Sequence, residues 1–466
     1  MDTHENKPNP GLATRREFIK KTSTLAAAAA TTGLFTGCQT PVYGQTQAPS
    51  PGRVIGANDR ISIGIIGVGV GIGQNHLENI QKNGGTNNVV VACASDLYSK
   101  RRDLAKVKAG LKDEDVYLEY RKILDRKDVD AVLIATHDPW HAQITIDAIQ
   151  AGKHVYCEKP MTRYLDEAFR VYDTVKGAKG LVYQIGSQGT SAGGWKKCAE
   201  LIAEGKLGQL VWAQGFYCRN SINGEWNDPP FDLDKDSTAE TVDWKTWQGN
   251  VHNKIPFSNE RFHRWRKFYP YCAGVLGDLA PHRLHPLMLA AGAEFPARVT
   301  SLGTHNVHAD KNKPDAEERE IPEHQQLLAE FPSGALITLT CGTVNARSPG
   351  FVLYCHKATL DVADGGNRVD VLPETPWSDD IDPATYDGMQ VEDIRMHEKN
   401  FFDCIRNGNT PNGNIDLAIR VQTVLSLAEM SNRLNMICLF DEKTRAITDG
   451  NGKKIESITY GTLVSS

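Results

Sequence analysis

Short apolar segments alternate with helix-forming segments along residues 61–186. The apolar segments cover residues 61–67, 89–95, 130–136, 154–158 and 180–186, and the helical segments cover 99–110, 118–126, 141–151 and 165–176, with one more helix from Gln74. Nearly continuous apolar strands separated by helices are typical of a parallel sheet that helices cover on both faces. The pattern therefore predicts a doubly wound α/β domain that binds its ligand at the carboxyl ends of the strands.

The composition is that of a folded, slightly acidic chain. It has 466 residues, 40% hydrophobic and 23% charged, with 52 Lys and Arg against 57 Asp and Glu. This length allows two or three domains. The net charge of −5 argues against a nucleic-acid binder that neutralises phosphates. No uncharged apolar run of about 18 residues follows residue 40, which excludes a polytopic membrane protein.

Residues 1–37 are typical of an export signal. Arg15 and Arg16 precede Phe18 and Lys20, and residues 22–37 are rich in alanine and carry no charge. This order resembles a twin-arginine signal, which implies export of an already folded protein. The alternative is an alanine-rich surface helix. We therefore expect a protein that faces the periplasm.

The residues after the leader leave its processing open. Cys38 ends an LFTGC sequence that is similar to a lipoprotein box, so lipidation at Cys38 and simple cleavage near Gly44 are both possible. Residues 38–57, rich in Gln, Pro, Ser and Gly, predict a flexible tether. The nine cysteines after Cys38 are isolated, which favours free thiols over a disulfide framework.

A cluster of glycines follows the first apolar strand. Gly67, Gly69, Gly71 and Gly73 lie between that strand and a helix, an arrangement that lets backbone N–H groups approach a pyrophosphate. Asp96, at the end of the second strand, is placed to bind ribose hydroxyls and to repel a 2′-phosphate. The sequence therefore predicts NAD rather than NADP. The alternative is that the basic side chains at 100–102 receive a phosphate.

Several motifs resemble the Gfo/Idh/MocA family, the group of glucose–fructose oxidoreductase and inositol dehydrogenase. They are ATHDPWH (135–141), GKHVYCEKPMT (152–162), IGSQ (185–188), WKTWQG (244–249), RFHRWRKFYPYCAGVLGD (261–278) and NIDLAIRVQTVLSLAEMSNRL (414–434). The resemblance covers roughly residues 58–445, and the EKP tripeptide at 158–160 is its most specific part.

The resemblance implies two domains. Residues 58–184 would form an NAD(P)-binding Rossmann domain, and residues 185–466 an α/β domain with a large, open, mainly antiparallel sheet for substrate and subunit contacts. Strand-like segments at 209–219, 298–305, 324–331, 335–343 and 351–355, and helical segments at 391–407 and 415–435, agree with this. We therefore expect a homo-oligomer.

Lys159 is the candidate base. Hydride transfer from a carbinol carbon leaves a hydroxyl proton that needs an acceptor, and a desolvated lysine beside a positively charged nicotinamide has a lowered pKa. The resemblance likewise implies a catalytic lysine at this position. The alternative is a lysine that only pairs with Glu158, and Pro160 would fix the turn that projects the side chain.

The sequence GDLAPHRLH carries a second candidate group. The resemblance implies that Asp278 and His282 contact sugar hydroxyls, with His282 as proton acceptor or relay. His285 stands where the family commonly has an acid, which leaves open which hydroxyl is bound. The alternative is that the three side chains together ligate a metal. Pro281 and Pro286 argue against the regular helix that such a site needs, so we predict no metal.

Further residues complete the predicted site. The cofactor contacts would be Gly67, Gly69, Gly71, Gly73, Asp96, Thr136, His141, Glu158, Lys159 and Gln188, and the substrate contacts Arg261, Trp265, Arg266 and His285. Rings stack on carbohydrates and guanidinium groups bond their hydroxyls, although such a cluster also suits interdomain packing. The sequence contains no nucleophile elbow and no P-loop.

Together these features predict an oxidoreductase that transfers hydride between a tightly bound nicotinamide cofactor and a hydroxyl carbon of a sugar, glycoside or cyclitol. One alternative is an NAD-dependent glycosidase that acts by transient oxidation and elimination. Another is a non-catalytic sugar-binding protein. The expected partners are a small carbohydrate and further copies of the chain, with no nucleic acid, and with the membrane only through Cys38.

Overall fold

The computed structural model describes residues 60–459, except residues 229, 250, 253, 306, 309 and 311–315. All of them belong to one compact unit, Gln47–Ser466. The predicted signal peptide over residues 1–37, Cys38, and the predicted tether over residues 38–57 lie outside the described residues.

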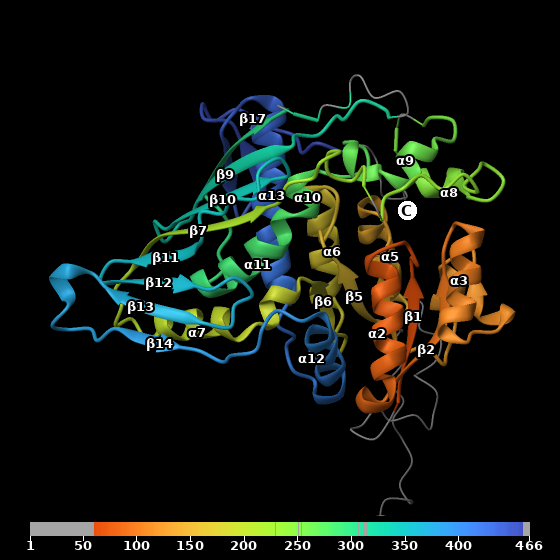
Figure 1. Ribbon diagram of the computed structural model, residues 1–466, viewed down its shortest axis with the longest axis horizontal. Helices are drawn as coiled ribbons and strands as arrows, with labels where there is room; N and C mark the ends of the chain where they lie inside the picture. The colour runs from red at the N-terminus through yellow and green to blue at the C-terminus, as the bar shows by residue number, and fades with distance from the viewer. Residues whose placement is uncertain are drawn as a thin grey trace, which may run out of the picture. The chain divides into compact units, whose positions relative to one another are not determined.

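The first part of this unit is a six-stranded parallel sheet with the strand order β3-β2-β1-β4-β5-β6 (Figure 1). Its strands are β1 (Ile61–Ile66), β2 (Val89–Ser95), β3 (Val116–Tyr117), β4 (Ala131–Ile134), β5 (His154–Glu158) and β6 (Tyr183–Gly186). Its helices are α2 (Ile72–Asn87), α3 (Ser99–Ala109), α4 (Arg121–Leu124), α5 (His141–Gln150) and α6 (Leu165–Gly177).

Strand β4 shows why the sheet is covered on both faces. Ala131 and Leu133 pack into one hydrophobic cluster, whereas Val132 and Ile134 pack into another. Successive side chains of a strand point to opposite faces, so a continuous apolar run requires a core on each side. This confirms the predicted doubly wound parallel sheet.

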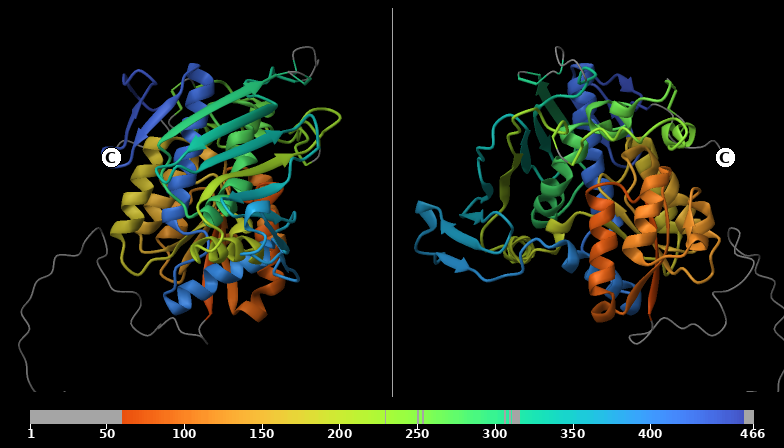
Figure 2. Two further views of the ribbon diagram at one scale, coloured as in Figure 1. Left: turned by 90° about the vertical axis from the view of Figure 1, so that its left-hand side faces the viewer. Right: turned by 45° about the vertical axis from the view of Figure 1, so that its right-hand side comes forward.

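The second sheet has eleven strands in the order β14-β13-β12-β11-β7-β10-β9-β8-β15-β16-β17, and only β7 and β10 pair in parallel. Its strands are β7 (Leu210–Cys218), β8 (Arg298–Thr304), β9 (His324–Glu330), β10 (Leu336–Gly342), β11 (Phe351–Cys355), β12 (Ala358–Val362), β13 (Val369–Pro373), β14 (Ala384–Tyr386), β15 (Cys438–Asp441), β16 (Ala446–Thr448) and β17 (Lys454–Ile455). This confirms the predicted large, mainly antiparallel sheet. Figure 2 (left) views its open face.

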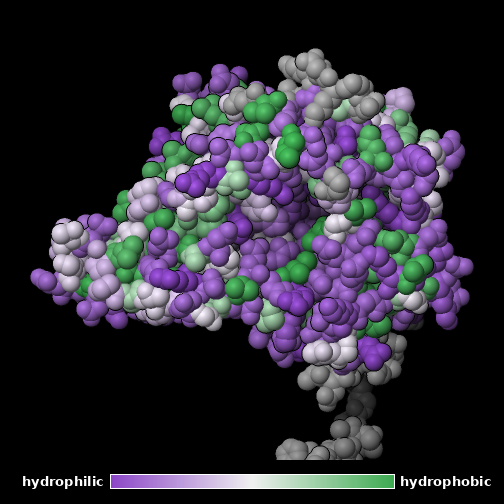
Figure 3. Space-filling model, in the orientation of Figure 1, coloured by the Kyte–Doolittle hydropathy of each residue, from purple (hydrophilic) through white to green (hydrophobic). Residues whose placement is uncertain are grey.

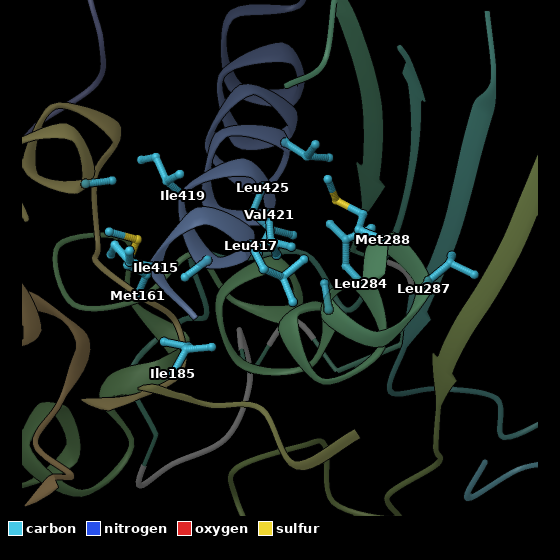
Figure 4. Packing of buried hydrophobic residues seen from close by; sticks show 14 of the residues in the cluster. Met161, Ile185, Leu284, Leu287, Met288, Ile415, Leu417, Ile419, Val421 and Leu425 are labelled. Carbon is cyan, nitrogen blue, oxygen red and sulfur yellow. The ribbon is translucent and has the colours of Figure 1, made fainter. Parts of the chain in front are cut away.

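Helices cover the inner face of this sheet. The remaining helices are α7 (Gly193–Ala203), α8 (Trp244–Gln248), α9 (Asn259–His263), α10 (Val275–Asp278), α11 (Ala280–Ala291), α12 (Ile394–Asn407) and α13 (Ile415–Leu434). Helix α13 is buried along most of its length because α6, α11 and β8 all pack on it. Its apolar side chains meet Leu284 and Met288 of α11 and Ile185 of β6 (Figure 4), so one core joins the two sheets.

The structure differs from the sequence-based expectation in three places. The helix expected over 118–126 is the short α4, preceded by the two-residue strand β3. Strands β12 to β17 were not expected. Helix α11 forms although Pro281 and Pro286 argued against it: Pro281 lies in the first turn, where no N–H is needed, and Pro286 only removes one internal hydrogen bond.

Two further findings concern the described residues as a whole. None of their helices combines the length and the apolar character that crossing a membrane requires. The nine cysteines after Cys38 are free thiols and all except Cys218 are buried, as predicted.

Candidate functional site

The glycine turn between β1 and α2 is held by close backbone packing. Gly67 has φ +92°, and a Cβ there would lie 2.7 Å from the carbonyl group of Ala135. A Cβ at Gly73 would lie 2.5 Å from the Gly67 oxygen. Gly69, in contrast, has only the Arg101 guanidinium nearby, at 3.7 Å. The turn therefore needs glycine at 67 and 73 for its own packing, and glycine at 69 keeps its surface open.

The Asp96 carboxylate closes this turn from the next strand. Its Oδ2 accepts the Val68 N–H at 2.8 Å, and its Oδ1 accepts the Tyr98 N–H at 2.9 Å. Each carboxylate oxygen has a second lone pair. Asp96 is therefore fixed by the backbone and can still accept hydrogen bonds from a ligand.

The three basic residues after Asp96 have separate surroundings. Lys100 pairs with Asp234 at 2.9 Å, and Arg102 donates to the backbone carbonyl of Asp96 at 2.8 Å. The Arg101 guanidinium lies over the Phe262 ring, 4.8 Å from its centroid, and lines a cavity at the sheet edge. Of the three, only Arg101 lines this cavity.

The cavity opens at the carboxyl ends of the parallel strands. Its floor includes Gly67, Gly69, Gly73, Asp96 and Thr136, as the sequence predicted, whereas Gly71 does not line it. On the face shown in Figure 3 the surface is hollowed near the centre, and the residues around the hollow are largely hydrophilic.

A segment after β7, called the covering segment below, contributes Trp247, Phe262 and Trp265 to the cavity lining. Residues 241–243 run antiparallel to residues 97–99. The Trp247 ring stacks on His137, with centroids 4.1 Å apart and planes 2° apart. The Trp247 carbonyl accepts hydrogen bonds from His137 Nε2 at 2.9 Å and Trp140 Nε1 at 3.1 Å. Burial lowers the pKa of His137 to about 3, so its ring is neutral.

These three residues are functional candidates to which the sequence analysis gave no role. His137 and Trp140 lie in ATHDPWH, and Trp247 lies in WKTWQG. Both motifs were noticed, but nothing in either one indicates that it packs against the other.

Lys159 and Asp278 form a polar pair next to the cavity, whose lining includes Arg266 but neither of these two residues. Lys159 Nζ donates to Asp278 Oδ1 at 2.8 Å and to the Asp278 backbone oxygen at 2.7 Å. Arg266 Nε donates to the same Oδ1 at 2.9 Å, and Trp226 Nε1 donates to Oδ2 at 3.1 Å. Burial alone would raise the pKa of Asp278, but Arg266 and Lys159 hold it well below its usual range. The peptide between Lys159 and Pro160 is cis.

His282 and His285 lie in different environments. Burial first, and then the charge of Lys159, keeps the pKa of His282 well below its usual value, so the ring is neutral. Its ring centroid is 5.7 Å from that of Tyr217. His285 is 1% exposed, and its Nδ1 donates to the Pro281 carbonyl at 2.7 Å. The structure therefore leaves His282 beside Lys159 and puts His285 in the core.

Three further residues predicted as cofactor contacts do not line the cavity. His141 is buried, with its ring nitrogens 2.7 Å from the Pro160 oxygen and 3.1 Å from the Thr136 oxygen. Glu158 is buried, and Gln188 lies at the start of a buried turn. His141, Glu158 and Gln188 therefore lie behind the cavity lining.

The predicted aromatic and basic cluster is split. Arg266 lies over the Trp265 ring at 4.1 Å, and both residues line the cavity. Arg261 instead pairs with Glu317 at 2.7 Å and lies over the Phe268 ring. Arg261 therefore belongs to the packing of the covering segment. Among the described residues, no group of three His, Cys, Asp or Glu side chains is arranged to hold a metal.

The comparison with known families identifies both halves of the chain. Residues 61–187 match the model of the Gfo/Idh/MocA oxidoreductase family with its NAD-binding Rossmann fold. Residues 243–361 match the model of the Gfo/Idh/MocA C-terminal domain.

Curated relatives match about a third of the chain. An inositol 2-dehydrogenase from Salmonella paratyphi B is 28% identical over 169 residues, which are 36% of this chain and 49% of that protein. A glycosyl hydrolase family 109 protein from Shewanella baltica is 33% identical over 177 residues, which are 35% of this chain and 37% of that protein. The chain thus matches half or less of the length of these relatives.

Solved structures share the fold over most of the chain. An oxidoreductase domain protein from Kribbella flavida has a TM-score of 0.64 and 20% identity, and the match covers 82% of this chain and all of that one. Levoglucosan dehydrogenase in complex with NADH and levoglucosan has a TM-score of 0.60 and 18% identity, with 84% and 99% covered. Since the two family models together span more than half of the residues, the chain belongs to the Gfo/Idh/MocA family.

Proposed function

We propose that the protein is an oxidoreductase that transfers hydride between a tightly held nicotinamide cofactor and a hydroxyl carbon of a sugar, glycoside or cyclitol. The observation that carries the proposal is the Lys159–Asp278 pair, in which Lys159 follows β5 at the same sheet edge as the glycine turn and Asp278 is bonded to Arg266 of the cavity lining. An amine and a neutral histidine near a cavity at the carboxyl ends of the strands are the groups that alcohol oxidation needs.

The residues present fit a dinucleotide. The glycine turn and the amino terminus of α2 would hold the pyrophosphate, since Cβ-free positions let the backbone N–H groups approach it. Asp96 would accept hydrogen bonds from the ribose hydroxyls. When bound, the nicotinamide supplies the hydride acceptor for the substrate carbon.

Lys159 and His282 would handle the proton. Asp278 takes two hydrogen bonds from Lys159 Nζ, which leaves one position of the amine for a substrate hydroxyl. In alcohol oxidation the unprotonated amine accepts the hydroxyl proton, and in the reverse direction the ammonium returns it. The neutral His282 ring offers a further acceptor for a neighbouring hydroxyl.

We propose NAD rather than NADP. The Asp96 carboxylate lines the ribose end of the cavity, where it would repel a 2′-phosphate. Of the three basic residues that the sequence left as phosphate ligands, Lys100 and Arg102 are engaged by Asp234 and by the Asp96 carbonyl, whereas Arg101 lines the cavity. These contacts support NAD.

Tight retention of the cofactor is supported by the covering segment. Trp247, Phe262 and Trp265 line the cavity opposite the glycine turn, and Trp247 is bonded and stacked to the nucleotide-binding half. A cofactor beneath these rings leaves only when the segment opens. Turnover would then proceed as a cycle in which a second substrate reoxidises the cofactor.

We also propose export by the twin-arginine route to the periplasm, on the strength of residues 14–37, with Cys38 lipidated or removed. The mass of the first peptide of the mature protein distinguishes lipidation of Cys38 from its removal.

We further propose a homo-oligomer formed through the open sheet face. Leu302, Leu328 and Leu372 support this, since they are 73%, 40% and 48% exposed on strands whose alternate residues are buried.

A second candidate is a glycosidase that oxidises its substrate transiently and eliminates the glycosidic substituent. The similarity to a glycosyl hydrolase family 109 protein, 33% identical over 177 residues, favours it. Such a reaction uses the same cofactor site and the same lysine, but it leaves no net oxidation.

The test begins with the exported full chain. It is denatured, and any released nucleotide is identified by mass spectrometry. The native protein is then incubated with sugars and glycosides. Bound NAD together with an oxidised or isomerised sugar supports the first proposal, and a cleaved glycoside supports the second. Failure to release or bind any nicotinamide nucleotide refutes both and leaves a sugar-binding protein. A Lys159→Ala variant that keeps full turnover refutes the role of the lysine.

A further inference from the structure

His76 is a buried histidine outside the predicted site, and it joins two acidic side chains. Its Nε2 lies 2.8 Å from Glu158 Oε1, and its Nδ1 lies 2.6 Å from Glu398 Oε1. The three residues are at most 2% exposed, and they come from α2, from the end of β5 and from α12. Helices α2 and α12 lie side by side (Figure 1). One ring therefore connects three elements that are far apart in the sequence.

The geometry fixes the charge of the ring. An ionised carboxylate only accepts hydrogen bonds, so a ring with a carboxylate on each nitrogen needs a proton on both. Burial alone would lower the pKa of His76, but the hydrogen bonds and charges of Glu158 and Glu398 outweigh it and raise the pKa to about 9. The cluster therefore holds one imidazolium and two carboxylates, with a net charge of −1, around neutral pH.

The groups around the cluster do not supply a second cation next to it. The Tyr156 ring lies edge-on to His76, with centroids 5.2 Å apart. His397 donates from Nε2 to the Ile185 carbonyl, and burial lowers its pKa to about 4, so it is neutral. The more distant charged groups that act on these residues are Asp393 and Arg395, on Glu398, and Lys196, on His397.

The cluster reaches Lys159 through the backbone. The second oxygen of Glu158, Oε2, accepts the Lys159 N–H at 3.3 Å. A Cβ at Gly186 would lie 2.5 Å from Glu158 Oε1, so glycine in β6 makes room for the carboxylate beside His76. Glu158 thus bonds His76 through its side chain, whereas the Lys159 side chain bonds Asp278.

We propose that Glu158, His76 and Glu398 form a positioning triad that fixes the peptide of Lys159 against the helix that begins at the glycine turn. The inference rests on the proposed function of Lys159, and it assigns His76 and Glu398 a role that does not involve touching substrate or cofactor. The imidazolium both neutralises Glu158 and ties the lysine-bearing segment to α2. The charge of the triad then sets the field in which Lys159 titrates.

Two substitutions change this charge in opposite directions. His76→Gln removes the cation and leaves two carboxylates. Glu398→Gln keeps an acceptor for Nδ1–H but removes one negative charge. A unit charge about 10 Å away at an effective dielectric of about 20 changes a pKa by roughly 1 unit. The pH midpoint of Lys159 should therefore rise by roughly 1 unit in His76→Gln and fall by a similar amount in Glu398→Gln.

The midpoint is measured without turnover, by acylating the full chain at a series of pH values and quantifying the Lys159 peptide by mass spectrometry. The matched control is His154→Gln. His154 lies at the opposite end of β5, and its Nδ1 accepts the Val182 N–H at 3.0 Å. This substitution alters a largely buried histidine of the same strand and should leave the Lys159 midpoint unchanged.

Turnover gives the second readout. Once a sugar that the wild-type protein oxidises has been found, His76→Gln should lower kcat for that sugar at least about tenfold. It should leave KM for the sugar within about threefold, because only the lysine is misplaced. A wild-type protein that oxidises nothing refutes the proposed function, and the labelling still decides on the triad. Unchanged Lys159 midpoints in both variants overturn the triad. If His76→Gln does not fold, the shift in Glu398→Gln decides alone.

Discussion

The glycine turn allows a prediction in which three similar substitutions have three different outcomes. Gly67→Ala places a Cβ 2.7 Å from the Ala135 carbonyl group at φ +92°. Gly71→Ala meets nothing within 4 Å but has φ +94°. Gly69→Ala has no positive φ and only a flexible guanidinium at 3.7 Å. The first change combines a clash with backbone strain, the second has the strain alone, and the third has neither.

The magnitudes follow from these geometries. At φ +94° and ψ −114°, Gly71 has a sparsely populated backbone conformation that costs other residues about 1–3 kcal/mol, so Gly71→Ala should lower the free energy of unfolding by that amount. The backbone contact cannot move aside in Gly67→Ala, and we expect a loss of about 3 kcal/mol or more. Gly69→Ala should stay within about 0.5 kcal/mol of the wild type, but its methyl group faces the cavity and should weaken NAD binding at least about tenfold.

The assay is urea unfolding of the NAD-free chain, together with calorimetric titration of NAD into each folded variant. Gly71→Ala serves as the control for Gly67→Ala, since the two share the positive φ. Equal stability of these two variants would refute the packing argument. Unchanged NAD affinity in Gly69→Ala would refute the assignment of the turn to the pyrophosphate.

Three further predictions concern the carboxylates and the covering segment. Asp278→Asn leaves two buried cations without their carboxylate and should lower the free energy of unfolding by about 3 kcal/mol at neutral pH. The pKa of Asp278 is lower in the folded than in the unfolded protein. The difference in the free energy of unfolding between the wild type and Asp278→Asn is therefore fully present above about pH 4 and should shrink as urea unfolding is measured at lower pH. Asp96→Asn should raise the ratio of NADP to NAD affinity at least about tenfold in equilibrium titrations, whereas Lys100→Gln should leave it within about twofold. Trp247→Ala should speed loss of bound cofactor on dilution at least about tenfold; Trp377→Ala, which changes a ring packed on the second sheet, should not.

The parts of the fold that local patterns encode were predictable. Alternating strands and helices gave the parallel sheet, and every strand of it except β3 was expected near its observed bounds. Strand β3 has only two residues, which is too short for a periodic signal. The prolines of α11 argued against a helix, but a helix stabilised by burial tolerates one lost hydrogen bond.

The candidate site was predictable where a motif and a strand end coincide. Lys159 and Asp278 were identified separately, and their contact joins residues 119 positions apart. Arg261 has a neighbourhood that the sequence does not reveal, since the acids that hold it lie 56 and 59 positions further on. His285 follows His282 by one helical turn, but its ring folds back to the Pro281 carbonyl. Side-chain direction and distant partners are set by packing, which no local pattern records.

The central claim is that Lys159 accepts a substrate proton beside a retained nicotinamide. Its most direct test is one measurement: the near-ultraviolet absorbance of reduced nicotinamide after the cofactor-loaded protein is mixed once with an excess of a sugar. The wild-type protein should develop this absorbance to about one equivalent of its bound NAD. Lys159→Met, with the same cofactor content, should develop it at least about a hundredfold more slowly. Equal rates in the two proteins would contradict the account.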